Sequence, residues 1–193
     1  MAQTLGSSCK ALIIGGSAGS LDVLLEVFPA LSPEINFPIV LVIHRKASKE
    51  SLLTDLLGAR TALPVTEAEE KEFLEPGKVY VAPADYHLLI EEDHSISLDY
   101  SEKVNYSRPS IDVTFQSAAE IFKQELVCIL LSGSNADGVE GLKTVNNFGG
   151  RVVIQHPESA LMPYMPQQAV NNVKPALLLT ATEMAGYIND LVR

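Results

Sequence analysis

The sequence predicts an α/β protein: a three-layer α/β/α sandwich around a mostly parallel, doubly wound sheet, with an antiparallel insertion at one edge. Short apolar runs rich in Val, Ile and Leu alternate with helical patterns, as in a parallel sheet covered on both faces. Residues 64–100 depart from this pattern, because their segments are shorter and more polar. At 193 residues the chain is long enough for one substantial core, so we expect a single domain over residues 1–193.

The first half of the chain predicts two strand–helix units followed by the insertion. ALIIGG (residues 11–16) predicts a buried strand, and the helix after it carries an apolar stripe of Leu21, Leu24, Leu25 and Phe28. PIVLVIH (38–44) predicts the second strand, and SKESLLTDLLG (48–58) predicts a short helix. Within the insertion, VYVAP, YHLLIEE and SISLDY predict short strands, with a turn at EDHS.

The second half of the chain continues the alternation of helices and strands. Its expected helices cover residues 111–124, 139–148 and 167–172, and a closing helix starts at Thr182. Its expected strands are LVCILLSG (126–133), RVVIQH (151–156) and ALLL (176–179).

The charge and the cysteine content exclude several classes of partner. The chain has 24 acidic and 14 basic residues and a net charge of −10, which repels polyphosphates and anionic lipid. We therefore expect no nucleic-acid partner. Cys9 and Cys128 have neither metal-site spacing nor the density of a secreted scaffold, which indicates reduced thiols in a cytoplasmic protein. No signal peptide and no apolar run near the ~20 residues of a membrane span occur, so we expect no membrane insertion.

Reactive side chains follow four of the expected strands. Ser17, His44 and His156 come at or just after three strand ends, and LVCILLSG runs into Asp137. In parallel sheets, ligands gather at the carboxyl ends of the strands. If these strands are neighbours, a serine, a histidine and a carboxylate meet at one edge, which is the constellation for nucleophilic acyl transfer.

The turn at Ser17 allows several interpretations. GGSAG matches the G-x-S-x-G nucleophile elbow, with a strand before it and a helix after it, but glycine and serine turns are common at such junctions. An α/β-hydrolase is disfavoured, because that fold places several strands before its nucleophile and the expected order here is Ser, His, Asp. The dinucleotide-binding fingerprint fails, since it requires glycine where Ser17 and Ser20 stand.

The histidines and Asp137 also have plain structural interpretations. His44 is compatible with a histidine that ends a strand and bonds to backbone, and Asp137 with a helix cap or turn former. His87 and His94 lie in the polar insertion, where we expect them to be solvated. None of the four histidines has metal-site spacing, so a zinc hydrolase is disfavoured.

Five motifs in order resemble the catalytic domain of CheB-type protein-glutamate methylesterases, the demethylases of chemotaxis receptors. They are IGGSAGS, VIH, NYSRPSIDVTF, LLSGSNADG and QHPESALMPYMPQQAV, and the match covers nearly the whole chain. The resemblance implies that Ser17 is the nucleophile, His44 the base and Asp137 the residue that orients the histidine, while His156 becomes a residue of the rim. It implies hydrolysis of glutamate methyl esters on methyl-accepting chemotaxis receptors, deamidation of certain receptor glutamines, and no metal or cofactor.

Some positions depart from the pattern of this family. Ala18, Ser20 and Ser134 replace its usual Thr, Gly and Met, and Arg45 and Lys46 stand beside the cleft where Met-Pro is frequent. These changes affect the expected rate and substrate more than the reaction class. Four matching positions are expected to shape the cleft or to fix its loops: Arg108, Pro109, Met165 and Pro166.

The resemblance leaves regulation and turnover open. Only about ten residues precede the first strand, so we expect a stand-alone catalytic domain without the receiver domain of typical members, and any phosphorylation control would come from a regulator in trans. The alternatives are a catalytically weak CheB-like binding or signalling module, and an esterase for a substrate outside chemotaxis. A nucleotide-binding domain is disfavoured by the failed glycine fingerprint.

Overall fold

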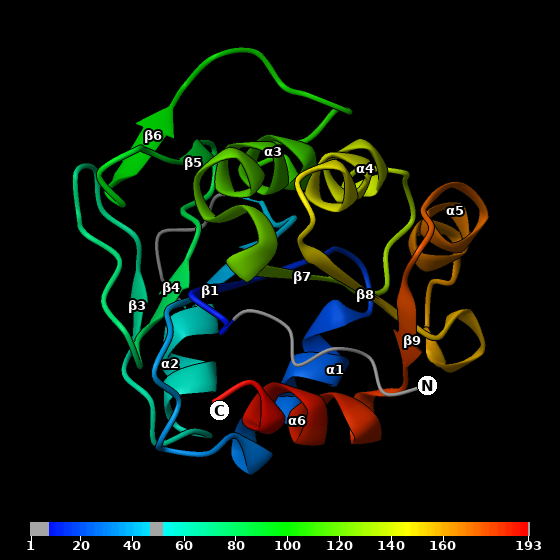
Figure 1. The fold of residues 1–193 in the computed structure, drawn as a ribbon, viewed down its shortest axis with the longest axis horizontal. Helices are drawn as coiled ribbons and strands as arrows, with labels where there is room; N and C mark the ends of the chain where they lie inside the picture. The colour runs from blue at the N-terminus through cyan, green and yellow to red at the C-terminus, as the bar shows by residue number, and fades with distance from the viewer. Residues whose placement is uncertain (1–7, 47–51, 193) are drawn as a thin grey trace.

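A computed structural model describes residues 8–46 and 52–192 and has three layers (Figure 1). A central parallel sheet has α3, α4 and α5 on one face and α1, α2 and α6 on the other. The helices are α1 Ser20–Val27, α2 Leu52–Gly58, α3 Ile111–Phe122, α4 Val139–Asn147, α5 Tyr164–Asn172 and α6 Ala181–Asp190. The predicted α/β/α sandwich is confirmed, although the predicted start of the helix at residues 48–58 lies outside the described residues.

The sheet is doubly wound about its centre. Its seven strands lie in the order β3-β4-β2-β1-β7-β8-β9 and all pair in parallel. They are β1 Ala11–Gly16, β2 Ile39–Ile43, β3 Val65–Glu67, β4 Val79–Val81, β7 Leu126–Leu130, β8 Arg151–Gln155 and β9 Leu177–Leu179. The chain builds outward from β1 on one side and then from β7 on the other, so the switch point lies between these two strands.

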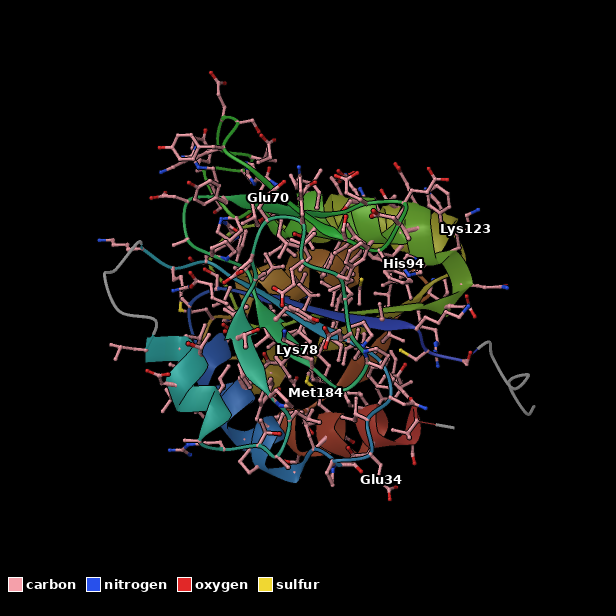
Figure 2. All side chains as sticks on the ribbon, turned by 90° about the vertical axis from the view of Figure 1, so that its left-hand side faces the viewer. Glu34, Glu70, Lys78, His94, Lys123 and Met184 are labelled. Atoms are coloured by element: carbon pink, nitrogen blue, oxygen red, sulfur yellow. The ribbon has the colours of Figure 1, made fainter. Side chains whose placement is uncertain are left out.

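Alternate residues of each strand supply two cores, one on each face of the sheet. Ile13 and Val40 belong to the core under α3, α4 and α5, whereas Leu12 and Leu41 belong to the core under α1 and α6. Figure 2 shows the sandwich from the side, with Met184 of α6 inside the second core. Because both faces are covered, the strands are continuous apolar runs.

The insertion is organised differently from the sequence-based expectation. β5 His87–Ile90 and β6 Ile96–Asp99 pair in antiparallel fashion, but they form a separate two-stranded sheet that packs against α3. VYV forms β4, which belongs to the parallel sheet. All three of its side chains are fully buried, as expected for a strand that is covered on both faces.

The expectation that His87 is solvated is wrong, whereas His94 is exposed as expected. His87 is only 1% exposed because the segment after β6 crosses over it. Its Nδ1 accepts a hydrogen bond from the backbone N–H of Ser110 (3.1 Å), and its Nε2 lies 2.9 Å from the carbonyl oxygen of Glu102. His87 therefore anchors both ends of this crossing segment.

Two further findings concern the thiols and the helices. Cys9 and Cys128 are free and buried. Burial raises the pKa of Cys9 to about 12 and that of Cys128 well above its ordinary value, so both thiols stay protonated and unreactive at neutral pH. None of the helices within residues 8–46 and 52–192 is both long and apolar enough to span a membrane.

Candidate active site

Ser17 and His44 leave the sheet side by side at its carboxyl edge. β1 and β2 pair with Gly16 opposite Ile43, and the N–H of His44 donates to the carbonyl of Gly16 (3.0 Å). The N–H of Ser17 donates to the carbonyl of Ser132 just beyond β7 (2.9 Å). The three strands whose ends carry or lead to the candidate residues are therefore neighbours, as the acyl-transfer hypothesis requires.

The turn after Ser17 is held by close contacts. Gly19 has φ of 81°, and a Cβ added there would lie 2.7 Å from the Ser132 hydroxyl, so this position requires glycine. The buried hydroxyl of Ser20 donates to the carbonyl of Ser17 (2.6 Å). Ser20, a departure from the family pattern, therefore stabilises the turn. The N–H groups of Ala18 and Gly19 have no acceptor among the described residues and lie where α1 begins, at its positive end.

His44 and Asp137 form a close pair at the switch point. His44 Nε2 lies 2.7 Å from Asp137 Oδ2; the Asp137 side chain is fully buried and that of His44 is 11% exposed. Asp137 follows the segment after β7 and precedes α4. Gly138, next in the chain, has φ of 95°, and a Cβ there would lie 2.7 Å from Leu130 Cδ1, which explains the Asp-Gly pair.

Asp137 accepts hydrogen bonds from many donors. Besides His44, they are the Ser110 hydroxyl (2.8 Å), Asn105 Nδ2 (2.9 Å) and the N–H groups of Ile111 (2.6 Å), Asp112 (3.1 Å) and Gly138 (3.1 Å). Burial by itself raises the pKa of Asp137, but the hydrogen bonds, led by that of His44, outweigh it and hold the pKa below its ordinary value. Asp137 is therefore ionised, so neutral His44 carries its proton on Nε2 and its Nδ1 is the basic nitrogen.

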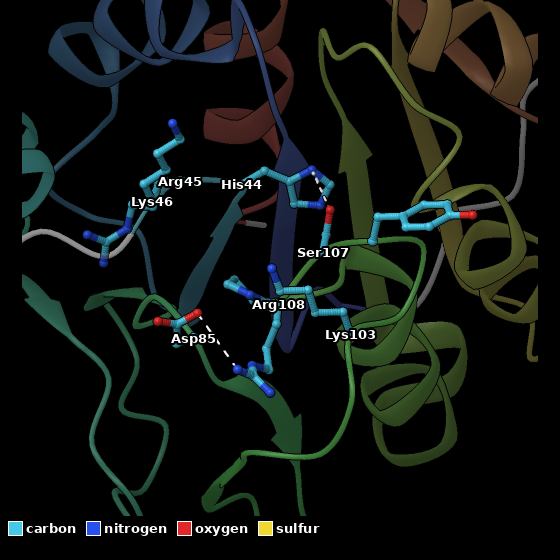
Figure 3. Close-up of a pocket in the computed structure, with 9 residues that line it drawn as sticks. His44, Arg45, Lys46, Asp85, Lys103, Ser107 and Arg108 are labelled. Carbon is cyan, nitrogen blue, oxygen red and sulfur yellow. Dashed lines mark hydrogen bonds and ion pairs between the residues drawn. The ribbon is translucent and has the colours of Figure 1, made fainter.

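The hydroxyl next to this basic nitrogen belongs to Ser107. Ser107 Oγ lies 3.3 Å from His44 Nδ1 (Figure 3), and within the described part of the chain no hydrogen bond joins Ser17 to His44. Ser17 and His44 instead line one cavity of about 460 Å³ beside β1 and β2. Ser107 was missed from the sequence, although it lies in the NYSRPS motif. The imidazole therefore contacts the Ser107 hydroxyl and shares a cavity with Ser17.

A second buried carboxylate is linked to Asp137. Asn105 Nδ2 donates to Asp112 Oδ2 (2.7 Å) as well as to Asp137. The two aspartates cap each other's helices, since Asp137 accepts from the first turn of α3 and Asp112 from the Gly141 N–H (2.6 Å) in the first turn of α4. Burial, and then the charge of Asp137, raise the pKa of Asp112 to about 6 despite these hydrogen bonds.

We expect the Asp112→Asn substitution to remove a pH-dependent loss of stability. A carboxyl group with a pKa of about 6 when folded and its ordinary 3.8 when unfolded binds more protons in the folded state, so the free energy of unfolding falls as the pH rises through this window. Asparagine does not titrate. The free energy of unfolding of the variant relative to wild type should therefore rise by on the order of 2 kcal/mol between about pH 4 and pH 7 in urea titrations. Titrating groups that the two proteins share contribute equally to both and cancel in the comparison. A difference in the free energy of unfolding that stays constant with pH would contradict the raised pKa of Asp112.

The remaining motif residues lie near the His44–Asp137 pair. Met165 is fully buried against Gly133, and Ser134 is exposed. His156 Nδ1 accepts from the N–H of Glu158 (3.3 Å), so this histidine caps a 3₁₀ turn. No group of three or more His, Cys, Asp or Glu side chains in residues 8–46 and 52–192 is placed to hold a metal ion.

Comparison with known proteins fits this geometry. A family model described as CheB methylesterase matches residues 12–188. The chain belongs to the CheB methylesterase family. The match confirms the family indicated by the sequence motifs.

Relatives of known name or structure extend the comparison. A CheB-family relative from Leptospira interrogans is 39% identical over 176 residues, which are 91% of both chains. A Thermotoga maritima protein named protein-glutamate methylesterase/protein-glutamine glutaminase is 32% identical and spans 96% of this chain and 55% of its own length. The crystal structure of the T. maritima CheB methylesterase catalytic domain matches with a TM-score of 0.90 and 32% identity, over 96% of this chain and 100% of that one.

Proposed function

We propose that this protein is a serine hydrolase that demethylates glutamate γ-methyl esters on chemotaxis receptors, with Ser17, His44 and Asp137 as its catalytic triad. The observation that carries the proposal is the pair of His44 with the buried, ionised Asp137 directly beside Ser17. The name of the T. maritima relative supports the reaction class.

The proposed reaction proceeds in two steps. His44 Nδ1 takes the proton of Ser17 as Oγ attacks the ester carbonyl, and Asp137 stabilises the resulting imidazolium. His44 then protonates the departing methoxide, so methanol leaves and a glutamyl ester of Ser17 remains. Water, deprotonated by His44, attacks this ester, and the proton passes from His44 to the departing Ser17 Oγ as the carboxylate is released. The same steps on a receptor glutamine release ammonia. Neither step requires a metal or cofactor.

The first step requires a change at His44. In the structure, Nδ1 faces Ser107, so it must turn toward Ser17 when the substrate binds. The N–H of Ser17 is bonded to Ser132, so the oxyanion of the tetrahedral intermediate would be stabilised by the N–H groups of Ala18 and Gly19.

A rim of exposed apolar side chains supports a protein substrate. Leu21 and Leu52 line the cavity that contains Ser17, Tyr106 lines the neighbouring cavity that contains His44, and Leu161 lies against Gly19. Such a rim around a polar centre is typical of a protein-binding site.

The second candidate is a CheB-like binding module with little turnover. The contact of His44 with Ser107 favours it, because a base that stays on Ser107 would not activate Ser17.

The test is methanol release from receptor-bearing membranes of the source organism. Membranes methylated with a labelled methyl donor should release labelled methanol when the protein is added, and membranes whose methyl esters were first hydrolysed by mild alkali should release none. If methylated receptors lose no label in the presence of the protein, the esterase proposal is wrong and the binding module is favoured.

A further inference from the structure

A basic pocket lies on the side of His44 away from α1. It is a cavity of about 400 Å³ whose lining includes His44, Arg45, Lys46, Asp85, Lys103 and Arg108 (Figure 3). Four of these residues are cations and one is an acid, in a protein whose net charge is −10. Four of the 14 Lys and Arg residues are therefore gathered beside the candidate base.

The two arginines form the walls of the basic pocket. Arg45 donates to Glu67 (2.6 Å) and to the carbonyl of Ala82 (3.3 Å). Arg108 donates to the carbonyl of Ser101 (2.8 Å), lies over the ring of Tyr100 (3.9 Å) and is 3.8 Å from Asp85. Such contacts fix the two guanidinium groups and partly neutralise them.

The two lysines of the basic pocket remain available to bind a ligand. Lys46 and Lys103 are exposed, and neither forms an ion pair or a side-chain hydrogen bond with another described residue. Lys103 is drawn between His44 and Arg108, extending toward the middle of the basic pocket (Figure 3). A free ammonium group on a flexible stem is suited to bind a carboxylate as a point charge.

We infer that the basic pocket binds a carboxylate side chain of the substrate protein, close to the glutamyl ester that Ser17 attacks, and that Lys103 is its main cation. The inference rests on the proposed esterase function. His44 lines both the basic pocket and the cavity that contains Ser17, so one substrate segment can occupy the two together. The acidic remainder of the surface disfavours a large polyanion, whereas a single acidic side chain fits a local pocket.

The pocket therefore selects ester-bearing segments that carry a neighbouring acidic residue. A partly exposed charge pair contributes up to about 1 kcal/mol, which corresponds to roughly fivefold in kcat/KM. This preference should appear mainly in KM, since the carboxylate is bound equally before and during the reaction, and it should weaken as salt is added.

The experiment compares two peptides with one glutamate γ-methyl ester, flanked on both sides by glutamates or by glutamines. We expect wild type to hydrolyse the acidic peptide with a kcat/KM several-fold higher than the neutral one. The ratio should fall to about one in Lys103→Gln and below one in Lys103→Glu. Lys143→Gln changes a partly exposed lysine on α4 outside the basic pocket; it is the control and should keep the wild-type ratio.

Binding measured without turnover separates this inference from the proposed function. Ser17→Ala protein, with and without Lys103→Gln, is titrated with both fluorescently labelled peptides. Tighter binding of the acidic peptide that depends on Lys103 supports the basic pocket even if no peptide is hydrolysed, an outcome that would contradict only the esterase. Equal binding and equal kcat/KM for the two peptides would overturn the inference while leaving the esterase intact.

Discussion

If Ser17 is the nucleophile as proposed, replacing it by alanine is expected to lower methanol release from methylated receptors by at least about 10³-fold, as loss of the nucleophile does in serine hydrolases. The fold should persist, because the contacts that fix this turn are made by the Ser17 backbone, whose N–H donates to Ser132 and whose carbonyl accepts from Ser20. Alanine keeps both backbone bonds and removes only the hydroxyl. Initial rates of labelled methanol release, with a thermal unfolding curve for each protein, measure the effect.

Ser107→Ala is the matched control, since the Ser107 hydroxyl is the one that contacts the imidazole in the structure. Its Oγ lies 3.3 Å from His44 Nδ1, but it is not at a strand-to-helix turn with free N–H groups beside it. We expect this variant to keep the rate of methanol release within about tenfold of wild type. A hydroxyl that contacts the base only in the absence of substrate contributes little to the rate. A serine-reactive phosphonate should modify Ser17. Loss of activity in Ser107→Ala with retention in Ser17→Ala would assign the nucleophile to Ser107.

The positions of Ser17 and His44 at strand ends could be predicted from the sequence for a simple reason. Ser17 and His44 each follow a continuous apolar run, and in a parallel sheet such ends meet at one edge. The order of the strands in the sheet could not be predicted, because local sequence patterns carry no information about which strands pair. The pairing of β1 with both β2 and β7 shows that Ser17 lies at the centre.

The surroundings of Asp137 could not be predicted, because they come from a segment that crosses the molecule. The side chains of Asn105 and Ser110 can donate hydrogen bonds to Asp137 because residues 100–109 fold back over His87. The polar character of these residues suggests a solvated loop, and His87 was wrongly expected to be exposed. Asp112, in the first turn of α3, has the pattern of a residue that favours a helix N-terminus, and nothing local indicates that it caps α4.

Asp137→Asn is expected to lower the rate of methanol release by on the order of 10³–10⁴-fold and to destabilise the fold as well. Each polar group around the Asp137 side chain is a donor, so an amide nitrogen at this position would face another N–H or O–H whichever way it turned. An unpaired donor of this kind costs about 1–3 kcal/mol. If the amide nitrogen faces His44, Nε2 must lose its proton to accept, and Nδ1 then carries the proton and is no longer a base.

The two effects can be measured separately, which makes Asp137→Asn a test of mechanism as well as of packing. Urea titrations give the loss of stability, and rates taken well below the unfolding transition give the loss of activity. Asp93→Asn, on the exposed turn between β5 and β6, is the matched control, and we expect it to keep the wild-type rate. A folded Asp137→Asn protein with near wild-type turnover would show that Asp137 serves only to cap α3. A folded protein without turnover would show that ionised Asp137 keeps the His44 proton on Nε2, which leaves Nδ1 free to deprotonate Ser17.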